Sequence, residues 1–323
     1  MILITGATGF LGSEVAKQLA QNGDAIVCIK RSNSVIPDLL KPYGERIKWV
    51  DADVLDVFAL EDALQGVTQV YHSAAIVSFN PADNKAMIKT NVEGTANVVN
   101  LCNQYNIRLV HVSSVAGLGE AKPGELINEN TYLEDTLHSD GYALSKYEGE
   151  MEVWRGIAEG LNAVIVNPSM IIGANAGTKG TGQIFEKVRK GFKFYTNGSI
   201  GFVDVEDVAK SMIQLMNSDI EAQRFIITAE NRDYKGLFAE AAQCFGIKSP
   251  QSEAKPWALN WAWRISGITR FLTGGRFIGI DKVSAQAASK NLNYNNSKIV
   301  KATGIEFKSI SLSIKQICTA LSN

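Results

Sequence analysis

The sequence predicts an α/β protein in which a doubly wound parallel sheet is followed by a smaller, mainly helical C-terminal domain. Short apolar runs alternate with helical patterns through the first half of the chain, a glycine-rich loop follows the first apolar run directly, and the alternation loosens after Pro168. Strands that alternate with helices need crossover connections, and such connections produce a parallel sheet that helices cover on both faces.

The expected strands of this sheet are six short apolar runs, at residues 2–5, 25–29, 47–50, 67–72, 108–113 and 162–166. Helical patterns lie between most of them, and the clearest are LGSEVAKQLAQN at 11–22 and DNKAMIKTNVEGTANVVNLCNQ at 83–104. The order of strands and helices therefore fits a layered α/β domain.

The second half of the chain is less regular. A glycine-rich loop occupies 173–183, while FVDVEDVAKSMIQLM (202–216) and RFIIT (224–228) indicate a return to the main sheet. Later residues are mainly helical, and SKIVKATG is expected to form a helix that begins at Ser297 as N-cap and ends at Gly304. We expect two domains, one formed by 1–167 and about 201–229, the other by about 168–200 and 230–323.

Composition and charge exclude several classes of protein. The chain has 323 residues, of which 46% are hydrophobic, and a net charge of −1, so it can bury a sizeable core. The near-neutral balance, without a long Lys/Arg run, argues against nucleic acid as a partner. The widely spaced cysteines fit neither a zinc site nor a disulfide framework, and we expect reduced thiols in a cytoplasmic protein. They are Cys28, Cys102, Cys244 and Cys318.

We expect no targeting or membrane-spanning segment. MILIT begins as a strand, without a charged n-region or a cleavage site. No apolar run reaches the roughly 18 residues of a spanning helix. The nearest, WALNWAWRISGITRFL (257–272), contains Arg264 and Arg270. An amphipathic helix that covers a pocket is favoured there over a helix lying on a membrane surface.

The loop TGATGFLG (5–12) joins the first strand to the first helix. Glycines in such a loop allow a tight turn, close approach of the backbone to a pyrophosphate and close helix–strand packing, while the helix N-terminus faces the negative charge. This position predicts a dinucleotide site of Rossmann type rather than a purely structural turn. The expected contacts are Gly6, Thr8, Gly9, Phe10, Leu11 and Gly12.

Two further places fit a dinucleotide. Asp53, with Val54 beside it, follows the third strand and could accept a hydrogen bond from the adenine amino group; the alternative is a cap for the helix that begins near Asp56. The run HSAA puts small residues after the fourth strand, where the chain passes close to a ligand, although tight packing would also explain them. The expected contacts in this run are Ser73, Ala74 and Ala75.

The stretch DGYALSKYEGE (140–150) places Tyr142 and Lys146 four residues apart in a helical pattern. Residues at i and i+4 share one helix face, so a phenol would lie one turn from an ammonium. A free phenol has a pKa of about 10 and a nearby cation favours its ionised form, so the pair could pass a proton near neutral pH. The same spacing recurs at Tyr294 and Lys298, so spacing alone does not identify the functional pair.

Taken in order, TGATGFLG, HSAA, NVEGT, VSSVAGLG and YALSK resemble the motifs of the extended short-chain dehydrogenases/reductases of the NAD-dependent epimerase/dehydratase family, over essentially the whole chain. NPSMIIGAN (167–175) strengthens the resemblance, and the asparagine before Pro168, where many sugar-nucleotide enzymes have an arginine, looks more like the branch that contains dihydroflavonol reductases, cinnamoyl-CoA reductases and 3β-hydroxysteroid dehydrogenases. The C-terminal third, where substrate choice resides, lacks strong motifs.

The resemblance implies roles for individual residues. Tyr142 would be the general acid/base, Lys146 would bind the nicotinamide ribose and lower the pKa of the tyrosine, and Ser114 would hydrogen-bond the substrate oxygen, with Ser113 as its less favoured neighbour. Tyr294 has no such serine nearby, so the first Tyr–Lys pair is expected to be the functional one. Further implied cofactor contacts are Asn91, mainly in a supporting role, and Asn167, Pro168 and Ser169.

Other polar residues have simpler interpretations. His72 and His111 fall within apolar strands and are expected to be packed, neutral imidazoles. Asp204 and Asp207 are expected to cap or charge the start of the following helix.

The cofactor preference is predicted from IVCIKRSNS (26–34). An NAD-selective domain usually has an acidic residue at the end of the second strand, whereas a 2′-phosphate requires positive charge. That place is filled by Lys30 and Arg31, with Ser32 as a further donor, and the next carboxylate along the chain is Asp38. An isolated Lys-Arg pair could simply be solvated, but after this strand it favours NADP(H) over NAD(H).

We expect an NADPH-preferring reductase of a ketone or aldehyde on a small, largely apolar substrate. Candidate pocket walls, which could equally face a core, are Phe79, Ile172 and Trp257–Trp263, beside Ser114 and Tyr142. The alternatives are a nucleotide-sugar epimerase with bound NAD and a non-catalytic NADP-binding sensor or scaffold. A homodimer is compatible with any of these functions.

Overall fold

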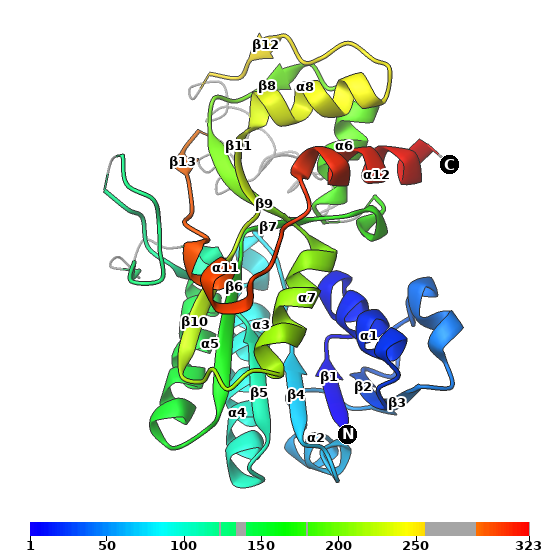
Figure 1. The fold of residues 1–323 in the computed structure, drawn as a ribbon, viewed down its shortest axis with the longest axis vertical. Helices are drawn as coiled ribbons and strands as arrows, with labels where there is room; N and C mark the ends of the chain where they lie inside the picture. Colours follow the sequence, from blue (N-terminus) through cyan, green and yellow to red (C-terminus); the bar gives the residue numbers. More distant parts are fainter. Residues whose placement is uncertain (123, 134–139, 179, 256–288, 323) are drawn as a thin grey trace.

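In a computed structural model, the protein is described for residues 1–122, 124–133, 140–178, 180–255 and 289–322. Within these ranges one parallel sheet has seven strands in the order β10–β6–β5–β4–β1–β2–β3 (Figure 1). The strands are β1 Ile2–Thr5, β2 Ile26–Lys30, β3 Ile47–Asp51, β4 Gln69–His72, β5 Arg108–Val112, β6 Ala163–Pro168 and β10 Gln223–Ile227. The expected parallel sheet is confirmed, including the return of RFIIT to it as β10.

Helices cover both faces of the sheet (Figure 1). On one face α1 (Phe10–Asn22) packs against α7 (Val205–Met216), and both contribute to one apolar core. On the other face α2 (Val57–Ala63), α4 (Gly94–Gln104) and α5 (Gly141–Ala158) enclose a second core. Because each face is covered by helices from successive crossovers, the fold is the expected doubly wound one.

The strand order reverses beside β1. The chain runs from β1 outward to β2 and β3, then crosses to β4 on the other side of β1 and continues outward to β5 and β6. Thr5 ends β1 directly opposite His72, which ends β4. In open parallel sheets of this kind, ligands bind outside the carboxyl ends of the strands at such a reversal.

A second, smaller lobe lies over the carboxyl ends of these strands (Figure 1). Its core is formed by large buried side chains such as Phe185, Phe202 and Leu237. It contains short strands as well as helices: β7 Met170–Ile172, β8 Phe194–Tyr195, β9 Ser199–Asp204, β11 Glu230–Asp233, β12 Ser252–Glu253, β13 Asn291–Leu292, α6 Gly182–Arg189, α8 Tyr234–Cys244 and α12 Ile310–Ser322. The strands are a difference from the mainly helical pattern, because runs of two to six residues carry little periodicity.

The return to the main sheet begins later than the sequence pattern indicates. Strand β9 pairs with β7, β11 and β13 in the small sheet, and the helix α7 that follows it packs on the main sheet. Asp204 ends β9 and caps α7, since its carboxylate accepts a hydrogen bond from the N–H of Glu206 at 2.9 Å. The expected capping role of Asp204 is therefore confirmed.

Two helices differ from the sequence expectation. The pattern at 83–104 is interrupted by a π-helical segment, Lys89–Glu93 (η3), between α3 (Asn84–Ile88) and α4. Helix α11 (Ser297–Thr303) is preceded by Asn296 as N-cap, one residue before the expected Ser297, and ends at Gly304. The remaining short turns are 3-10 segments: η1 Asp38–Tyr43, η2 Pro81–Asp83, η4 Val115–Gly117 and η5 Ala174–Ala176.

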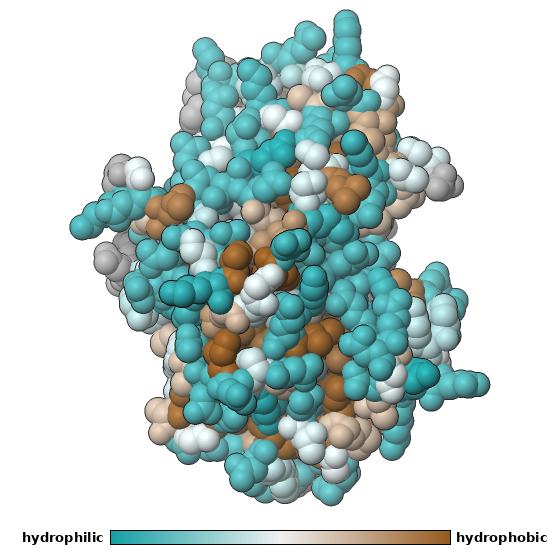
Figure 2. All heavy atoms as spheres, in the orientation of Figure 1, coloured by the Kyte–Doolittle hydropathy of each residue, from teal (hydrophilic) through white to brown (hydrophobic). Residues whose placement is uncertain are grey.

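None of the helices in the described ranges is long and apolar enough to cross a bilayer. The face of the molecule shown in Figure 2 is predominantly hydrophilic, with apolar side chains gathered near its middle. The stretch 257–272 lies outside the described residues.

Candidate active site

The glycine loop between β1 and α1 is packed too closely to accept a side chain at Gly6 or Gly12. Gly6 has a φ of +73°, and a Cβ atom on it would lie 2.6 Å from the backbone nitrogen of Ala74. A Cβ atom on Gly12 would lie 2.3 Å from the carbonyl oxygen of Gly6. The N–H of Gly9 donates to that same carbonyl at 2.9 Å, which closes the turn. The loop therefore requires glycine for its shape.

This turn presents the start of α1 to solvent. Gly9 is exposed and is the N-cap of the helix, and no side chain of the described residues caps it. Unpaired N–H groups at a helix start attract anions, and the 13 residues of α1 provide a full helix dipole. The loop thus fits a pyrophosphate, which Gly9 and the adjoining Thr8, Phe10 and Leu11 would approach through their backbone.

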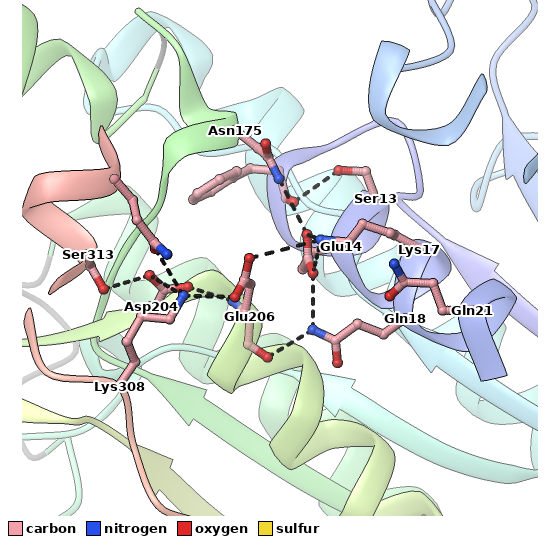
Figure 3. A network of polar contacts seen from close by, with 12 residues as sticks. Ser13, Glu14, Lys17, Gln18, Gln21, Asn175, Asp204, Glu206, Lys308 and Ser313 are labelled. Carbon is pink, nitrogen blue, oxygen red and sulfur yellow. Dashed lines mark hydrogen bonds and ion pairs between the residues drawn. The ribbon is translucent and has the colours of Figure 1, made fainter. Parts of the chain in front are cut away.

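A polar network connects helix α1 to neighbouring elements (Figure 3). Glu14 is only 1% exposed and accepts hydrogen bonds from Lys17 at 2.8 Å and from Asn175, in the second lobe, at 3.3 Å. Glu206 of α7 forms an ion pair with Lys308 at 2.7 Å and approaches Lys17 at 3.9 Å. The network joins α1 to α7 and to the segment that precedes α12.

The run HSAA packs against the glycine loop. The hydroxyl of Ser73 donates to the carbonyl oxygen of Thr5 at 2.7 Å, and the N–H of Ala74 donates to the hydroxyl of Thr5 at 3.1 Å. Ala75 follows and is half-buried. These bonds hold the ends of β1 and β4 together beside Gly6.

The two strand histidines are buried and neutral, as predicted. The ring nitrogens of His72 lie 2.7 Å from the hydroxyl of Thr5 and 3.0 Å from that of Thr95, and burial lowers the pKa of His72 to about 3. Burial also holds the pKa of His111 well below its usual value. The two rings lie 5.2 Å apart, centre to centre.

The first Tyr–Lys pair lies at the start of α5. Asp140 caps this helix by accepting from the N–H of Ala143 at 2.8 Å. Lys146, one turn after Tyr142, is buried and donates to the carbonyl oxygen of Val112 at 2.8 Å. Burial lowers the pKa of Lys146 to about 8, and the carboxylate of Glu150 acts in the opposite direction.

Ser114 lies just past the end of β5, next to this pair. Its hydroxyl accepts from the N–H of Ala116 at 3.1 Å and lies beside the phenol of Tyr142. Burial raises the pKa of Tyr142, and the neighbouring Ser114 hydroxyl opposes the rise. The ammonium of Lys146 is directed to the carbonyl oxygen of Val112, and its expected lowering of the tyrosine pKa stays a prediction. The hydroxyl of Ser113 is buried and unpaired within the described chain.

The second Tyr–Lys pair has a structural environment. Tyr294 is buried in a small core and precedes α11, so it does not share a helical face with Lys298. The ammonium of Lys298 donates to the carbonyl oxygen of Arg224 at 2.9 Å and lies over the ring of Phe225. Of the two pairs, only Tyr142 and Lys146 lie beside the ends of the central strands.

The end of β2 differs from the sequence expectation in one respect. Lys30 forms an ion pair at 2.6 Å with Asp51, which lies directly opposite it on β3. Its charge is therefore already partly engaged by a carboxylate that is 21 residues away in the sequence. Arg31 and Ser32 follow β2 and are exposed.

Near the end of β3, Asp53 does not cap α2. The cap is Asp56, whose carboxylate accepts from the N–H of Ala59 at 3.1 Å, whereas the carboxylate of Asp53 accepts from the N–H of Leu55 at 3.0 Å. Val54 packs closely against Gly94, because a Cβ atom added to Gly94 would lie 2.6 Å from the side chain of Val54. The contact of Asp53 with adenine stays a prediction.

Asn91 holds the backbone beside the site. Its side chain exchanges two hydrogen bonds with the backbone of Ile76, at 2.8 and 2.9 Å, and donates to the hydroxyl of Ser145 at 3.0 Å. It lies in the π-helical segment, and such segments are frequent at functional sites. The contacts agree with a supporting role.

The remaining predicted cofactor contacts lie at the end of β6. Asn167 and Pro168 are the last two residues of this strand and are buried. Ser169 follows them, and its hydroxyl donates to the hydroxyl of Thr228 at 2.9 Å. The amide of Asn167 donates to the carbonyl oxygen of Ser114 at 3.2 Å and to the carboxylate of Glu150 at 2.7 Å.

The two described pocket-wall candidates have different environments. Phe79 is 40% exposed and lies edge-to-face with Tyr142, with ring centres 5.6 Å apart. Ile172 is fully buried in the core of the second lobe. Trp257–Trp263 lies outside the described residues.

The buried ion pair between Glu150 of α5 and Arg224 of β10 was not predicted from the sequence. The spacing of residues along α5 could have indicated Glu150. Glu150 follows Lys146 by four residues and Tyr142 by eight, so all three share one face of α5. Arg224 has no comparable signal, because it meets α5 only through the fold.

Residues 2–227 match the NAD dependent epimerase/dehydratase family. This match covers more than half of the chain. The protein belongs to that family.

Similar proteins include both reductases and other members of the fold. A Synechocystis sp. protein named "Putative dihydroflavonol 4-reductase" is 29% identical over 315 residues, which are 95% of this chain and 90% of that protein. Cinnamoyl-CoA reductase 1 of Petunia hybrida is 27% identical, with 77% of this chain and 78% of that protein aligned. The crystal structure of a protein named gox2253 has a TM-score of 0.85 at 27% identity, covering 100% of this chain and 98% of that one.

Proposed function

We propose that the protein is an NADPH-preferring reductase of a ketone or aldehyde on a small, largely apolar substrate. The observation that carries the proposal is the contact of Ser114 with Tyr142, one helical turn from Lys146, at the carboxyl ends of the central strands. The glycine loop that fits a pyrophosphate lies at the same edge of the sheet. The relatives named as reductases support this choice within the family.

In this proposal each side chain has a separate task. A bound nicotinamide supplies the hydride that reaches the carbonyl carbon. Ser114 donates a hydrogen bond to the carbonyl oxygen, and Tyr142 gives that oxygen the proton that completes the alcohol. Lys146 binds the ribose hydroxyls and orients the cofactor relative to Tyr142. In the reverse direction Tyr142 takes the proton from the alcohol.

We assign the NADPH preference mainly to Arg31. Its guanidinium is exposed at the end of β2 and can form paired hydrogen bonds with a 2′-phosphate. Lys30 contributes less than expected because Asp51 holds its ammonium. A tenfold preference for NADPH over NADH, about 1.4 kcal/mol, is the smallest value that this proposal allows.

A panel of probes tests the reaction. NADPH oxidation is measured with cinnamaldehyde, cyclohexanone and a dihydroflavonol, and UDP-glucose is tested for epimerisation with NAD. The proposal expects turnover of at least one carbonyl and none of the nucleotide sugar. Turnover of UDP-glucose alone would instead establish the epimerase, which the family also contains.

One weaker alternative remains as an outcome of the same panel. A non-catalytic NADP-binding sensor would bind NADPH but turn over no probe, although the retention of Ser114, Tyr142 and Lys146 argues against it. A homodimer is a separate proposal that sedimentation of the purified protein would test.

A further inference from the structure

A buried ion pair joins the catalytic helix to the edge strand of the sheet. Glu150 of α5 and Arg224 of β10 are 1% and 5% exposed, and their nearest charged atoms are 3.0 Å apart. Charges removed from water are stabilised only where the remaining hydrogen-bonding groups also find partners. The partners of this pair therefore show what it holds in place.

The other oxygen of Glu150 is directed at the active site. It accepts from the amide of Asn167 at 2.7 Å, and the same amide donates to the carbonyl oxygen of Ser114 at 3.2 Å. The first oxygen, which meets Arg224, also accepts from the indole of Trp154 at 3.2 Å. Since both oxygens accept, a carboxylate satisfies every donor, and a carboxamide would place a donor against a donor.

The remaining donors of Arg224 hold the loop that leads toward Tyr142. They bind the carbonyl oxygens of Glu129 at 2.7 Å and of Thr131 at 3.0 Å, and the guanidinium lies 4.7 Å from the ring centre of Tyr132. The carboxylate of Glu129 in turn accepts from the N–H of Ile226 at 3.0 Å. This loop lies between Ser114 and the start of α5 in the sequence.

We infer that Glu150 is a positioning residue for the reaction. Through Asn167 it fixes the strand end that carries Ser114, and through Arg224 it fixes the loop at residues 128–132. Ser114 and Tyr142 come from different elements, and their relative position determines whether both reach one carbonyl oxygen. Because small displacements of reacting groups reduce rates strongly, this carboxylate controls turnover without touching the substrate. The inference rests on the proposed reductase function.

Glu150→Gln in the full-length chain tests the inference. We expect peptides that contain Ala116 and Gly117, whose N–H groups bind the hydroxyl and the carbonyl of Ser114, to exchange hydrogen at least about tenfold faster. NADPH affinity should change less than about twofold, while kcat on the most reactive carbonyl of the panel falls at least about tenfold. A matched control is Glu240→Gln, which breaks the 2.7 Å pair with Arg232 in the second lobe and should alter neither the hydrogen exchange around Ser114, nor NADPH affinity, nor kcat.

A second variant separates positioning from folding. Glu150→Gln combined with Arg224→Met removes both buried charges, so its Tm should recover toward the wild-type value while kcat stays low. Recovery of kcat together with Tm would overturn the inference and leave a purely structural pair. Unchanged exchange around Ser114 in Glu150→Gln would also overturn it. If the wild-type protein turns over no carbonyl, the reductase proposal fails, and the exchange experiment still decides whether Glu150 fixes Ser114.

Discussion

Tyr142 is the residue on which the proposed reaction depends most directly. Tyr142→Phe keeps the ring that packs edge-to-face with Phe79 but removes the proton that would reach the carbonyl oxygen. We expect turnover of the panel carbonyl to fall by about 10²–10⁴-fold, with NADPH affinity nearly unchanged. Tyr294→Phe is the matched control and should have nearly wild-type turnover. If Tyr142→Phe kept wild-type turnover, Tyr142 would not be the general acid/base.

Lys146 connects function to stability through its depressed pKa. Its folded-state pKa of about 8 lies below the ordinary value of 10.5, so folding disfavours the charged form. This cost is present in full below pH 8 and is relieved between pH 8 and about 10.5, where the unfolded chain alone remains protonated. His72 and His111 stay neutral throughout this window.

Lys146→Met should therefore stabilise the protein at pH 7, by about 1–3 kcal/mol, while abolishing turnover. The difference in Tm between variant and wild type, followed by calorimetry, should narrow as the pH rises from 8 toward 10. If the difference in Tm between Lys146→Met and the wild type did not change with pH, the charge of Lys146 would not be the cause of the difference in stability.

If the proposed NADPH preference is right, Arg31 and Asp51 have opposing effects on cofactor choice. Arg31→Ala should remove most of the difference between NADPH and NADH affinity and barely affect NADH. Asp51→Asn should strengthen NADPH binding, because it releases Lys30 from the 2.6 Å ion pair. Calorimetric titration of the protein with each nucleotide measures both effects. Equal affinities in the wild type, or a preference for NADH, would contradict the assignment and favour the epimerase.

At the scale of elements, the glycine loop can be predicted from sequence because a backbone shape restricts the residue type. Gly12→Ala would bring a Cβ atom within 2.3 Å of the Gly6 carbonyl oxygen. Because this oxygen belongs to the backbone, the clash can be relieved only by a shift of the loop itself. We expect NADPH affinity to fall at least about tenfold and stability to fall by about 1–3 kcal/mol. Gly44→Ala, with its nearest neighbour at 3.6 Å, is the control in the same titration and melting experiments. If Gly12→Ala bound NADPH with wild-type affinity, the loop would be able to shift enough to accept a side chain at residue 12, contrary to this prediction.

Other elements show why the rest of the site could not be predicted. The pairing of Lys30 with Asp51 depends on the register of two strands, and that of Glu150 with Arg224 joins residues 74 positions apart. Neither is visible in local spacing. The strands of the second lobe are not predictable because they are short, and the break in the helix at 83–104 occurs in a π-helical segment, KTNVE, that contains neither the glycine nor the proline that would signal it. Elements with a repeated pattern or a strict backbone requirement were predictable, whereas long-range pairs were not.

At the scale of the whole molecule, the two lobes are joined where the segment before α12 crosses the start of α7 (Figure 3). The ammonium of Lys308 lies 2.7 Å from Glu206 and 3.3 Å from Asp204, and its backbone N–H donates to Asp207 at 2.7 Å. Ser313 of α12 donates to the same Asp204 carboxylate at 2.6 Å. Asp204 is almost completely buried, so its charge depends on these partners.

Lys308→Met should consequently weaken the attachment of α12 to the rest of the protein. Removing one partner of a largely buried carboxylate leaves it less well compensated, and we expect a loss of about 1–3 kcal/mol in the free energy of unfolding. Lys41→Met is the matched control, because the Lys41–Asp38 pair is exposed and such pairs contribute roughly 0–1 kcal/mol. Both variants should bind NADPH normally, since neither residue adjoins the glycine loop. If calorimetric melting showed equal losses for the two variants, the connection through Asp204 would not be what holds the lobes together.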